Sequence, residues 1–196
     1  MKLLTKLWPF KSEKSYQQDN SVDTHGLKKV VLVGSPNVGK SVIFNRLTSV
    51  YATVSNYPGT TVMVTRGKGY LGGEHVEVVD TPGMYSLLPV TEEETVTRRL
   101  LLSEHPEIVI HVVDAKNLSR TLPLTLQLLE AGLPVILDVN IMDEAERMGL
   151  RINTEKLSKR LGIPVIATVS TAGRGIKNLK KVVGEYVAAG IRTGSL

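Results

Sequence analysis

The 196-residue chain has no cysteine, few aromatic residues and no long hydrophobic run. The lack of cysteine excludes disulfides and thiolate metal sites, and it fits a reducing, cytosolic setting. No apolar stretch approaches the roughly 20 residues of a membrane-spanning helix, so we expect this chain to be soluble. The N-terminal MKLLTKLWPF has Lys6 in its middle and no small-residue cleavage site after it, which argues against a secretory signal.

A nucleic-acid partner is also not expected. The net charge is only +5, and the first 29 residues, with six lysines against three acidic residues, hold three of those charges. Scattered Lys and Arg usually form a solvated surface, and no basic, aromatic-rich stretch is present. The 42% hydrophobic and 22% charged content is typical of one globular domain with a full core.

The chain divides into a tail, a domain and a second short tail. Residues 1–27 are mostly polar and lack periodicity, which predicts a flexible tail. Four apolar residues between Leu3 and Trp8 share one helical face. They are open to two interpretations: a basic amphipathic turn on a membrane surface, or a frayed end too short to form a stable helix. We expect the domain to span 28–190 and a C-terminal tail to span 191–196.

The domain alternates strand and helix patterns, which predicts an α/β fold. We predict six strands, mostly parallel, with one antiparallel strand in a hairpin at Gly72-Gly73 and helices on both faces of the sheet. The predicted strands are 28–34, 61–71, 74–80, 107–115, 134–140 and 164–170. The predicted helices are 40–50, 119–132 with Pro123 in its first turn, 154–162 with Thr154 as N-cap, and 175–190.

A phosphate-binding loop follows the first strand. The stretch from Gly34 to Ser41 reads GSPNVGKS, which is G-x-x-x-x-G-K-S between a strand and a helix. Gly34 and Gly39 permit a backbone whose N–H groups point inward, and those groups join the positive helix end in holding phosphates. Lys40 would reach the β- and γ-phosphates, and the Ser41 hydroxyl would bind Mg²⁺.

Two further segments fit a phosphate sensor. Asp80 ends a strand and begins D-T-P-G, so it is a natural anchor for Mg²⁺, while Gly83 can donate its N–H to a γ-phosphate. In NYPGTTVMV, either Thr60 or Thr61 could complete the Mg²⁺ coordination, although a Thr pair also suits a plain strand edge.

The stretch NIMD, from Asn140 to Asp143, follows another strand and fits a guanine reader. Asp143 can accept hydrogen bonds from guanine N1–H and N2–H₂, and adenine offers neither in that arrangement. Asn140 can bridge the base edge and the phosphate loop, and a backbone N–H near Ala172 can meet guanine O6. Together the motifs predict a Ras-like P-loop domain that binds GTP or GDP. The nucleotide-binding residues would be Gly34, Ser35, Pro36, Asn37, Val38, Gly39, Lys40, Ser41, Gly59, Thr60, Thr61, Val62, Met63, Asp80, Thr81, Pro82, Gly83, Asn140, Ile141, Met142, Asp143, Ser170, Thr171 and Ala172.

From about Lys28 to Val183, the sequence resembles the N-terminal GTPase domain of FeoB, the ferrous iron transporter family. The distinctive stretches are DAKNLSRTLPLTLQLLEAGLPVIL and NIMDEAERMG. The resemblance implies a slow GTPase that regulates or energises Fe²⁺ transport. It implies a place on the cytoplasmic side of the inner membrane, a permease in the same or a separate chain, and possible self-association.

The resemblance also assigns roles at the site. It implies that Thr61 is the switch threonine and that Asn37 helps bind a K⁺ ion that stimulates hydrolysis, with stabilisation of the loop as the alternative role of Asn37. Met84 stands where Ras-type enzymes hold a water-orienting Gln, so we name no side-chain base and expect slow hydrolysis. The catalytic set would be Asn37, Lys40, Thr61 and Gly83. The metal set would be Ser41, Thr61 and Asp80 for Mg²⁺ and Asn37 for K⁺.

The sequence departs from the family pattern at both ends. The helical subdomain and permease that usually follow are missing, and a tail precedes the first strand. The chain could therefore be a stand-alone relative, one product of a split gene or a shortened piece. Two other functions stay open: a GTPase in ribosome or tRNA work, and a nucleotide-dependent binding module with negligible turnover.

The acidic run and the histidines have structural explanations that do not involve iron. The run from Glu92 to Glu94 could recruit Fe²⁺, but the first turn of a helix explains it better, because the helix dipole favours acidic residues there. His111 lies in an apolar run and is expected to be a core-strand histidine. The other histidines are scattered, so we propose no iron site.

The residue after Asn140 yields the first testable prediction. A Lys is usual there, and its stem covers the guanine face and contacts the loop. Ile141 can cover the base but donates no hydrogen bond. We therefore expect retained guanine specificity with weaker affinity and fast exchange. Ile141→Lys should slow GDP release in a stopped-flow dissociation assay, and an unchanged or faster rate would count against this interpretation.

Overall fold

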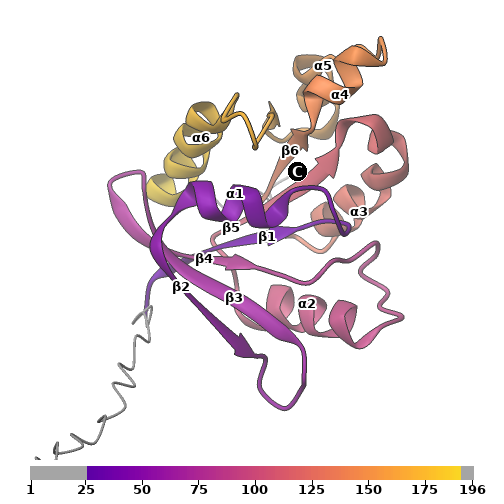
Figure 1. Cartoon of the computed structure of the whole chain (residues 1–196). Coiled ribbons are helices and arrows are strands. Elements are labelled where there is room, and N and C mark those ends of the chain that lie inside the picture. The colour runs from indigo at the N-terminus through magenta and orange to yellow at the C-terminus, as the bar shows by residue number, and fades with distance from the viewer. Residues whose placement is uncertain (1–25, 191–196) are drawn as a thin grey trace, which may run out of the picture.

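A computed structural model describes residues 26–190 as a seven-stranded mixed sheet with helices on both faces (Figure 1). The strand order is β2-β3-β4-β1-β5-β6-β7. The strands are β1 (Lys28–Val33), β2 (Thr48–Asn56), β3 (Met63–Leu71), β4 (Glu74–Asp80), β5 (Ile108–Asp114), β6 (Val135–Asn140) and β7 (Val165–Ala167). The helices are α1 (Lys40–Leu47), α2 (Glu92–Ser103), the 3₁₀ turn η1 (Ala115–Asn117), α3 (Leu118–Glu130), α4 (Met142–Arg147), α5 (Thr154–Leu161) and α6 (Ile176–Ala189).

The prediction of six strands was wrong, because α1 ends earlier than expected and the chain continues as β2. Thr48 is already extended, with φ −94° and ψ 162°, and its N–H closes the last turn of α1 on the Phe44 carbonyl. The following TSVYATV is rich in β-branched residues, which favour a strand over a helix. The predicted reversed strand is β3, which pairs antiparallel with both β2 and β4.

Two details of the predicted helices were wrong, and one helix was missed. Asn153, not Thr154, caps α5, because its Oδ1 accepts the Lys156 N–H at 2.8 Å. Helix α4 was not predicted at all, since it has only six residues and starts from a left-handed Ile141. Pro123 lies past the first turn of α3, because that helix begins at Leu118. The acidic run does form the first turn of α2, where Thr91 is the N-cap.

Two apolar layers sandwich the sheet. On one face, α2 and α3 pack leucines such as Leu100 and Leu128 against alternate valines of the central strands. On the other face, α1 and α6 pack Phe44 and Val183 against the intervening residues. The predicted helices on both faces are therefore confirmed. The loops at the carboxyl ends of the strands extend from this packed sheet.

The predicted tails fall almost entirely outside the described residues, so the boundaries at 27/28 and 190/191 stay predictions. The run of apolar residues between Leu3 and Trp8 lies outside them as well. Within 26–190, no helix has the length and apolarity that crossing a bilayer requires.

The hairpin between β3 and β4 packs against α6 through two glycines, and this contact can be tested. A Cβ on Gly184 would lie 2.6 Å from the Gly72 nitrogen, and one on Gly72 would lie 2.2 Å from the Gly184 carbonyl oxygen. Gly→Ala within a helix normally stabilises by about 1 kcal/mol. Here we expect Gly184→Ala to destabilise by about 1–3 kcal/mol through overpacking, measured by urea unfolding.

Lys180→Ala, on the exposed side of the same helix, is the control and should change stability by less than about 0.5 kcal/mol. If Gly184→Ala stabilised the protein as an ordinary helix substitution does, the close contact between α6 and the hairpin would be wrong.

Candidate functional site

The predicted motifs meet at the carboxyl edge of the sheet, where loops leave β1, β4, β6 and β7 (Figure 1). The phosphate loop connects β1 to α1, and two of its glycines have backbone and space that suit no other residue. Gly34 has φ +151°, and a Cβ there would lie 2.2 Å from the Val112 carbonyl oxygen. Gly39 has φ +94°, and its Cβ would lie 2.4 Å from Asn140 Nδ2. These close approaches fix the loop against β5 and β6.

Lys40 folds back over the loop that it follows. Its Nζ donates to the carbonyl oxygens of Gly34 and Ser35, both at 3.0 Å, and the residue is only 8% exposed. Burial lowers the pKa of Lys40, while the Asp80 charge opposes that shift. An ammonium group has three hydrogens, and these two bonds leave one donor and a poorly solvated charge for a phosphate.

Ser41 and Asp80 meet as the magnesium prediction requires. The Ser41 hydroxyl donates to Asp80 Oδ2 at 2.6 Å, and Asp80 Oδ1 is buried without a hydrogen-bond partner. Burial raises the pKa of Asp80, against the lowering effects of the Ser41 hydrogen bond and Lys40. An orphaned carboxylate oxygen beside a hydroxyl fits a divalent cation. Among residues 26–190, no group of three or more His, Cys, Asp or Glu is arranged so that it could hold a metal ion.

Thr60 and Thr61 lie in different surroundings. The Thr60 hydroxyl donates to the Tyr57 carbonyl oxygen at 2.9 Å and accepts the Val62 N–H at 3.2 Å, so it builds the turn after Tyr57. Thr61 is exposed, as are Gly59 and Met63, while Val62 is buried. Of the pair, Thr61 is thus the one with an exposed side chain outside that turn.

The D-T-P-G segment lies against the phosphate loop. A Cβ on Gly83 would be 2.6 Å from Pro36 Cγ, and the Met84 N–H donates to the Gly34 carbonyl at 3.1 Å. The buried Thr81 hydroxyl donates to the Leu32 carbonyl at 2.7 Å, which fixes the segment to β1. The Met84 side chain is fully buried, so it cannot contact a nucleotide or a water beside it.

Asn140 links the two halves of the site. Its Nδ2 donates to the Val38 carbonyl at 2.9 Å and to Ser170 Oγ at 3.0 Å, and its Oδ1 accepts the Ser170 N–H at 3.0 Å. Within residues 26–190, the Asp143 carboxylate pairs only with the exposed Arg147, at 3.1 Å, and such pairs are weak enough to yield to a base. The Met142 side chain faces the core, so only its backbone is at the site.

Ile141 adopts a left-handed conformation, with φ 61° and ψ 34°. A β-branched residue is strained there, because its Cβ substituents crowd the backbone. Asn37 in the phosphate loop has φ 63°, which an asparagine tolerates better, and its side chain is exposed.

One residue at the site was not predicted from the sequence. Arg46 of α1 donates from Nε to the Ser170 carbonyl at 3.2 Å and from a terminal nitrogen to the Thr171 carbonyl at 2.8 Å. It therefore holds the loop on which the guanine O6 contact is expected, beside the exposed Ala172. No local sequence signal distinguishes Arg46 from any surface arginine on an amphipathic helix.

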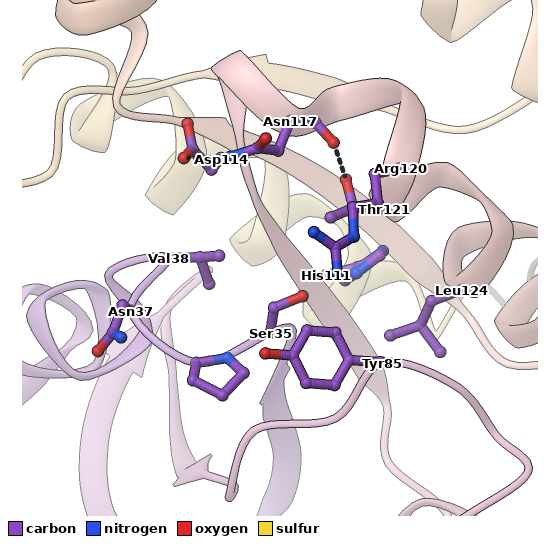
Figure 2. Close-up of a pocket in the computed structure, with 11 residues that line it drawn as sticks. Ser35, Asn37, Val38, Tyr85, His111, Asp114, Asn117, Arg120, Thr121 and Leu124 are labelled. Atoms are coloured by element: carbon purple, nitrogen blue, oxygen red, sulfur yellow. Dashed lines mark hydrogen bonds between the residues drawn. The ribbon is translucent and has the colours of Figure 1, made fainter.

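A cavity of about 430 Å³ lies beside the phosphate loop, on a side that the base-reading residues do not line (Figure 2). Tyr85, Asp114, Asn117 and Arg120 surround it, and His111 forms part of its lining. His111 is a buried core-strand histidine, as predicted, with Nδ1 2.9 Å from Thr125 Oγ1. Burial, helped by the Lys40 charge, lowers the pKa of His111 to about 3, so its ring is neutral at neutral pH.

Comparison with known proteins gives the family. The sequence model of "Ferrous iron transport protein B" matches residues 28–183. The chain belongs to the FeoB family. It is 44% identical over 161 residues to the Fe(2+) transporter FeoB of Shigella flexneri. The aligned region covers 80% of this chain and 21% of that protein. The chain therefore spans about a fifth of the length of that curated relative.

Solved structures of FeoB proteins match this chain as well, and they show its fold. The FeoB G-domain of Methanococcus jannaschii has a TM-score of 0.72 and 38% identity, covering 82% of this chain and 97% of that one. The cytosolic domain of T. maritima FeoB in a GDP form has a TM-score of 0.80 and 38% identity, covering 86% and 67%. This chain thus has the Ras-like P-loop GTPase fold of a FeoB G-domain.

The contact of Arg46 with the loop gives a prediction for this FeoB G-domain. Arg46→Ala removes two charge-assisted hydrogen bonds to loop carbonyls, so we expect GDP to dissociate about five- to tenfold faster. A fluorescent GDP analogue in a stopped-flow assay measures this rate. Arg174→Ala is the matched control in the same loop. Its exposed pair with Glu146 is worth little, so we expect less than about a twofold change. Equal effects of the two substitutions would contradict the role of Arg46.

Proposed function

We propose that this chain binds guanine nucleotide with Mg²⁺, hydrolyses GTP slowly to GDP and phosphate, and so regulates or energises ferrous iron transport. The observation that carries the proposal is the joint held by Asn140. Its amide connects the phosphate loop at Val38 to the base loop at Ser170, beside the expected guanine contact of Asp143. The T. maritima relative, solved in GDP and GMPPNP forms, supports the same ligand here.

Magnesium fits the residues at the phosphate end. Ser41 and Asp80 would hold it, with Thr61 joining from the exposed switch segment, and bound phosphates and water would complete the shell. When bound, Mg²⁺ neutralises charge on the β- and γ-phosphate oxygens. Lys40 would bind the same phosphates, and the Gly83 N–H would donate to the γ-phosphate.

Potassium would act next to this site through Asn37. The Asn37 side chain is exposed on the phosphate loop, where an amide oxygen can bind a monovalent cation. A cation there would neutralise charge that develops on the transferring phosphoryl group, as an arginine finger does in other GTPases.

Slow turnover follows from the residue after Gly83. Met84 is fully buried and carries no group that could orient water. Water would be placed by switch backbone and the cation alone. This same feature supports the second candidate, a nucleotide-dependent binding module with negligible turnover. The ribosome- or tRNA-associated alternative gains no support from any basic surface at the site.

The iron-related part of the proposal rests on the relatives, of which this chain covers about a fifth. The chain would act at the cytoplasmic side of the inner membrane, next to a permease in the same polypeptide or a separate subunit. Self-association is a further possibility that the family suggests. The domain would report its nucleotide state to that partner rather than bind iron itself.

Single-turnover GTP hydrolysis in potassium and in sodium tests the proposal. We expect potassium to stimulate hydrolysis by at least about tenfold, because it neutralises charge in the transition state. Asn37→Ala should lose the stimulation. Asn37→Gly should lose it too, and it removes the amide without straining the left-handed backbone at φ 63°.

The exposed Asn178→Ala on α6 is the control and should keep the stimulation. Absence of potassium stimulation, with no loss in either Asn37 variant, would overturn the cation proposal. Absence of hydrolysis in both salts, with nucleotide still bound, would favour the binding module.

A further inference from the structure

Asp138 is a buried carboxyl group on β6, two residues before Asn140. The two residues are separated by one position on β6, so their side chains project from the same face of the sheet. Asp138 is 0% exposed and Asn140 is 1% exposed. The next polar side chain on that face belongs to Thr168, just after β7, which is also 0% exposed. Nothing in the nucleotide site as described so far uses Asp138.

The orientation of the Asn140 amide follows from its partners. The Val38 carbonyl oxygen can only accept a hydrogen bond, so the atom 2.9 Å from it must be the amide nitrogen. The second hydrogen of that nitrogen goes to Ser170 Oγ at 3.0 Å. The amide oxygen therefore points toward the Ser170 N–H and toward Thr168 Oγ1, which lies 3.0 Å away. Because this oxygen can only accept, Thr168 has to donate its hydroxyl hydrogen to it.

Thr168 has only one hydrogen to give, and a second oxygen competes for it. Asp138 Oδ1 lies 2.8 Å from Thr168 Oγ1. If Asp138 is ionised, its carboxylate takes the hydrogen, and Thr168 and Asn140 then face each other with lone pairs. If Asp138 is protonated, it donates to Thr168, and Thr168 donates to Asn140. Only the protonated form places a hydrogen in both contacts, the one between Asp138 and Thr168 and the one between Thr168 and Asn140.

The surroundings of Asp138 also favour the protonated form. Its flanking residues in register are Val112 of β5 and Ile166 of β7. Its second oxygen, Oδ2, is buried without a hydrogen-bond partner. Burial raises the pKa of Asp138 to about 7, and the Thr168 hydrogen bond only partly opposes that shift.

No cation in the described part of the chain is directed at Asp138. On the same face of the sheet, Lys40 of α1 donates to loop carbonyls and Arg46 donates to the carbonyls of Ser170 and Thr171. In the adjoining loop and helix, Arg174 pairs with Glu146, and Asp143 pairs with Arg147. The charged residues of α6 are exposed, namely Lys177, Lys180, Lys181 and Glu185, and its Tyr186 is half-buried.

We propose that Asp138 is a positioning residue that acts as a neutral acid. A chain of two hydrogen bonds, from Asp138 to Thr168 and from Thr168 to Asn140, holds the Asn140 amide in the orientation that nucleotide binding needs; we call this chain the relay. Loss of the Asp138 proton turns the Thr168 hydroxyl away from Asn140 and loosens the joint between the phosphate loop and the base loop. Guanine nucleotide binding is thereby tied to pH. This inference rests on the proposed nucleotide-binding function.

The sign of the effect follows from linkage. The protonated protein binds nucleotide more tightly, so affinity is highest below the pKa of Asp138 and falls as pH rises through it. Bound nucleotide in turn raises that pKa. Loss of one hydrogen bond within the site corresponds to about a five- to tenfold change in affinity.

The test measures the GDP dissociation constant of the full chain between pH 5.5 and 8.5, for the wild type and three variants. We expect wild-type affinity to fall about five- to tenfold across neutral pH. Asp138→Asn supplies a permanent neutral donor to Thr168, so it should keep tight binding at high pH. Thr168→Val removes the relay and should bind weakly at every pH. The exposed Glu155→Gln on α5 is the charge-loss control and should match the wild type.

The GDP phosphates titrate identically with every variant, so the ratio of the Asp138→Asn constant to the wild-type constant isolates Asp138. A ratio that does not change with pH overturns the relay. Carboxyl ¹³C NMR of the wild type gives an independent measurement: titration of Asp138 below about pH 5 overturns the relay, and titration near neutral pH supports it. If GDP fails to bind at any pH, the proposed function fails instead.

Discussion

The hydrogen bond from Asn140 to the Val38 carbonyl is the interaction on which the rest of the site depends. It joins segments 102 residues apart in the sequence, one in the phosphate loop and one in the stretch proposed to read the base. Gly39 has to be glycine because any side chain there would occupy the place of the Asn140 amide. The other end of the same amide holds the Ser170 backbone, which Arg46 grips from α1. The phosphate and base halves of the site therefore cannot move independently.

The strand-end motifs were predictable because their chemistry is local. A phosphate loop needs glycines and a lysine at fixed spacing, and in the structure that loop contacts Asp80 through Ser41 and Asn140 through Val38. The roles of Arg46 and Asp138 were not predictable, because each depends on a partner from a distant segment, such as Ser170 or Thr168. Strand β2 was missed for a different reason. Its first residues continue the helical spacing of α1, and pairing with β3 overrides that local pattern.

Ile141 shows how a backbone constraint can hide inside a motif. In the sequence, Ile141 stands out because it replaces the usual lysine, whose stem would cover the guanine face. In the structure, Ile141 also makes the turn from β6 to α4 in a single left-handed residue, a conformation that costs about 1–3 kcal/mol for a residue other than glycine. The buried Asn140 on one side and the Met142 N–H, bonded to the Thr168 carbonyl on the other, hold it in place. The backbone around Ile141 is thus tied to the same Thr168 that contacts Asp138.

The buried Met84 explains how the switch segment is tied to the fold. Its backbone N–H holds the Gly34 carbonyl, and Gly83 packs directly on Pro36, so the segment reports on the phosphate loop through its backbone. Just beyond it, Glu94 of α2 accepts the N–H groups of Tyr85 and Val90, at 3.0 and 2.9 Å, and these hydrogen bonds lower the pKa of Glu94. Gln127 of α3 accepts the Leu87 N–H at 2.8 Å. A displacement of Gly83 must therefore either break these contacts or carry α2 and α3 with it. The Met84 side chain between these contacts is buried and carries no group that could orient water.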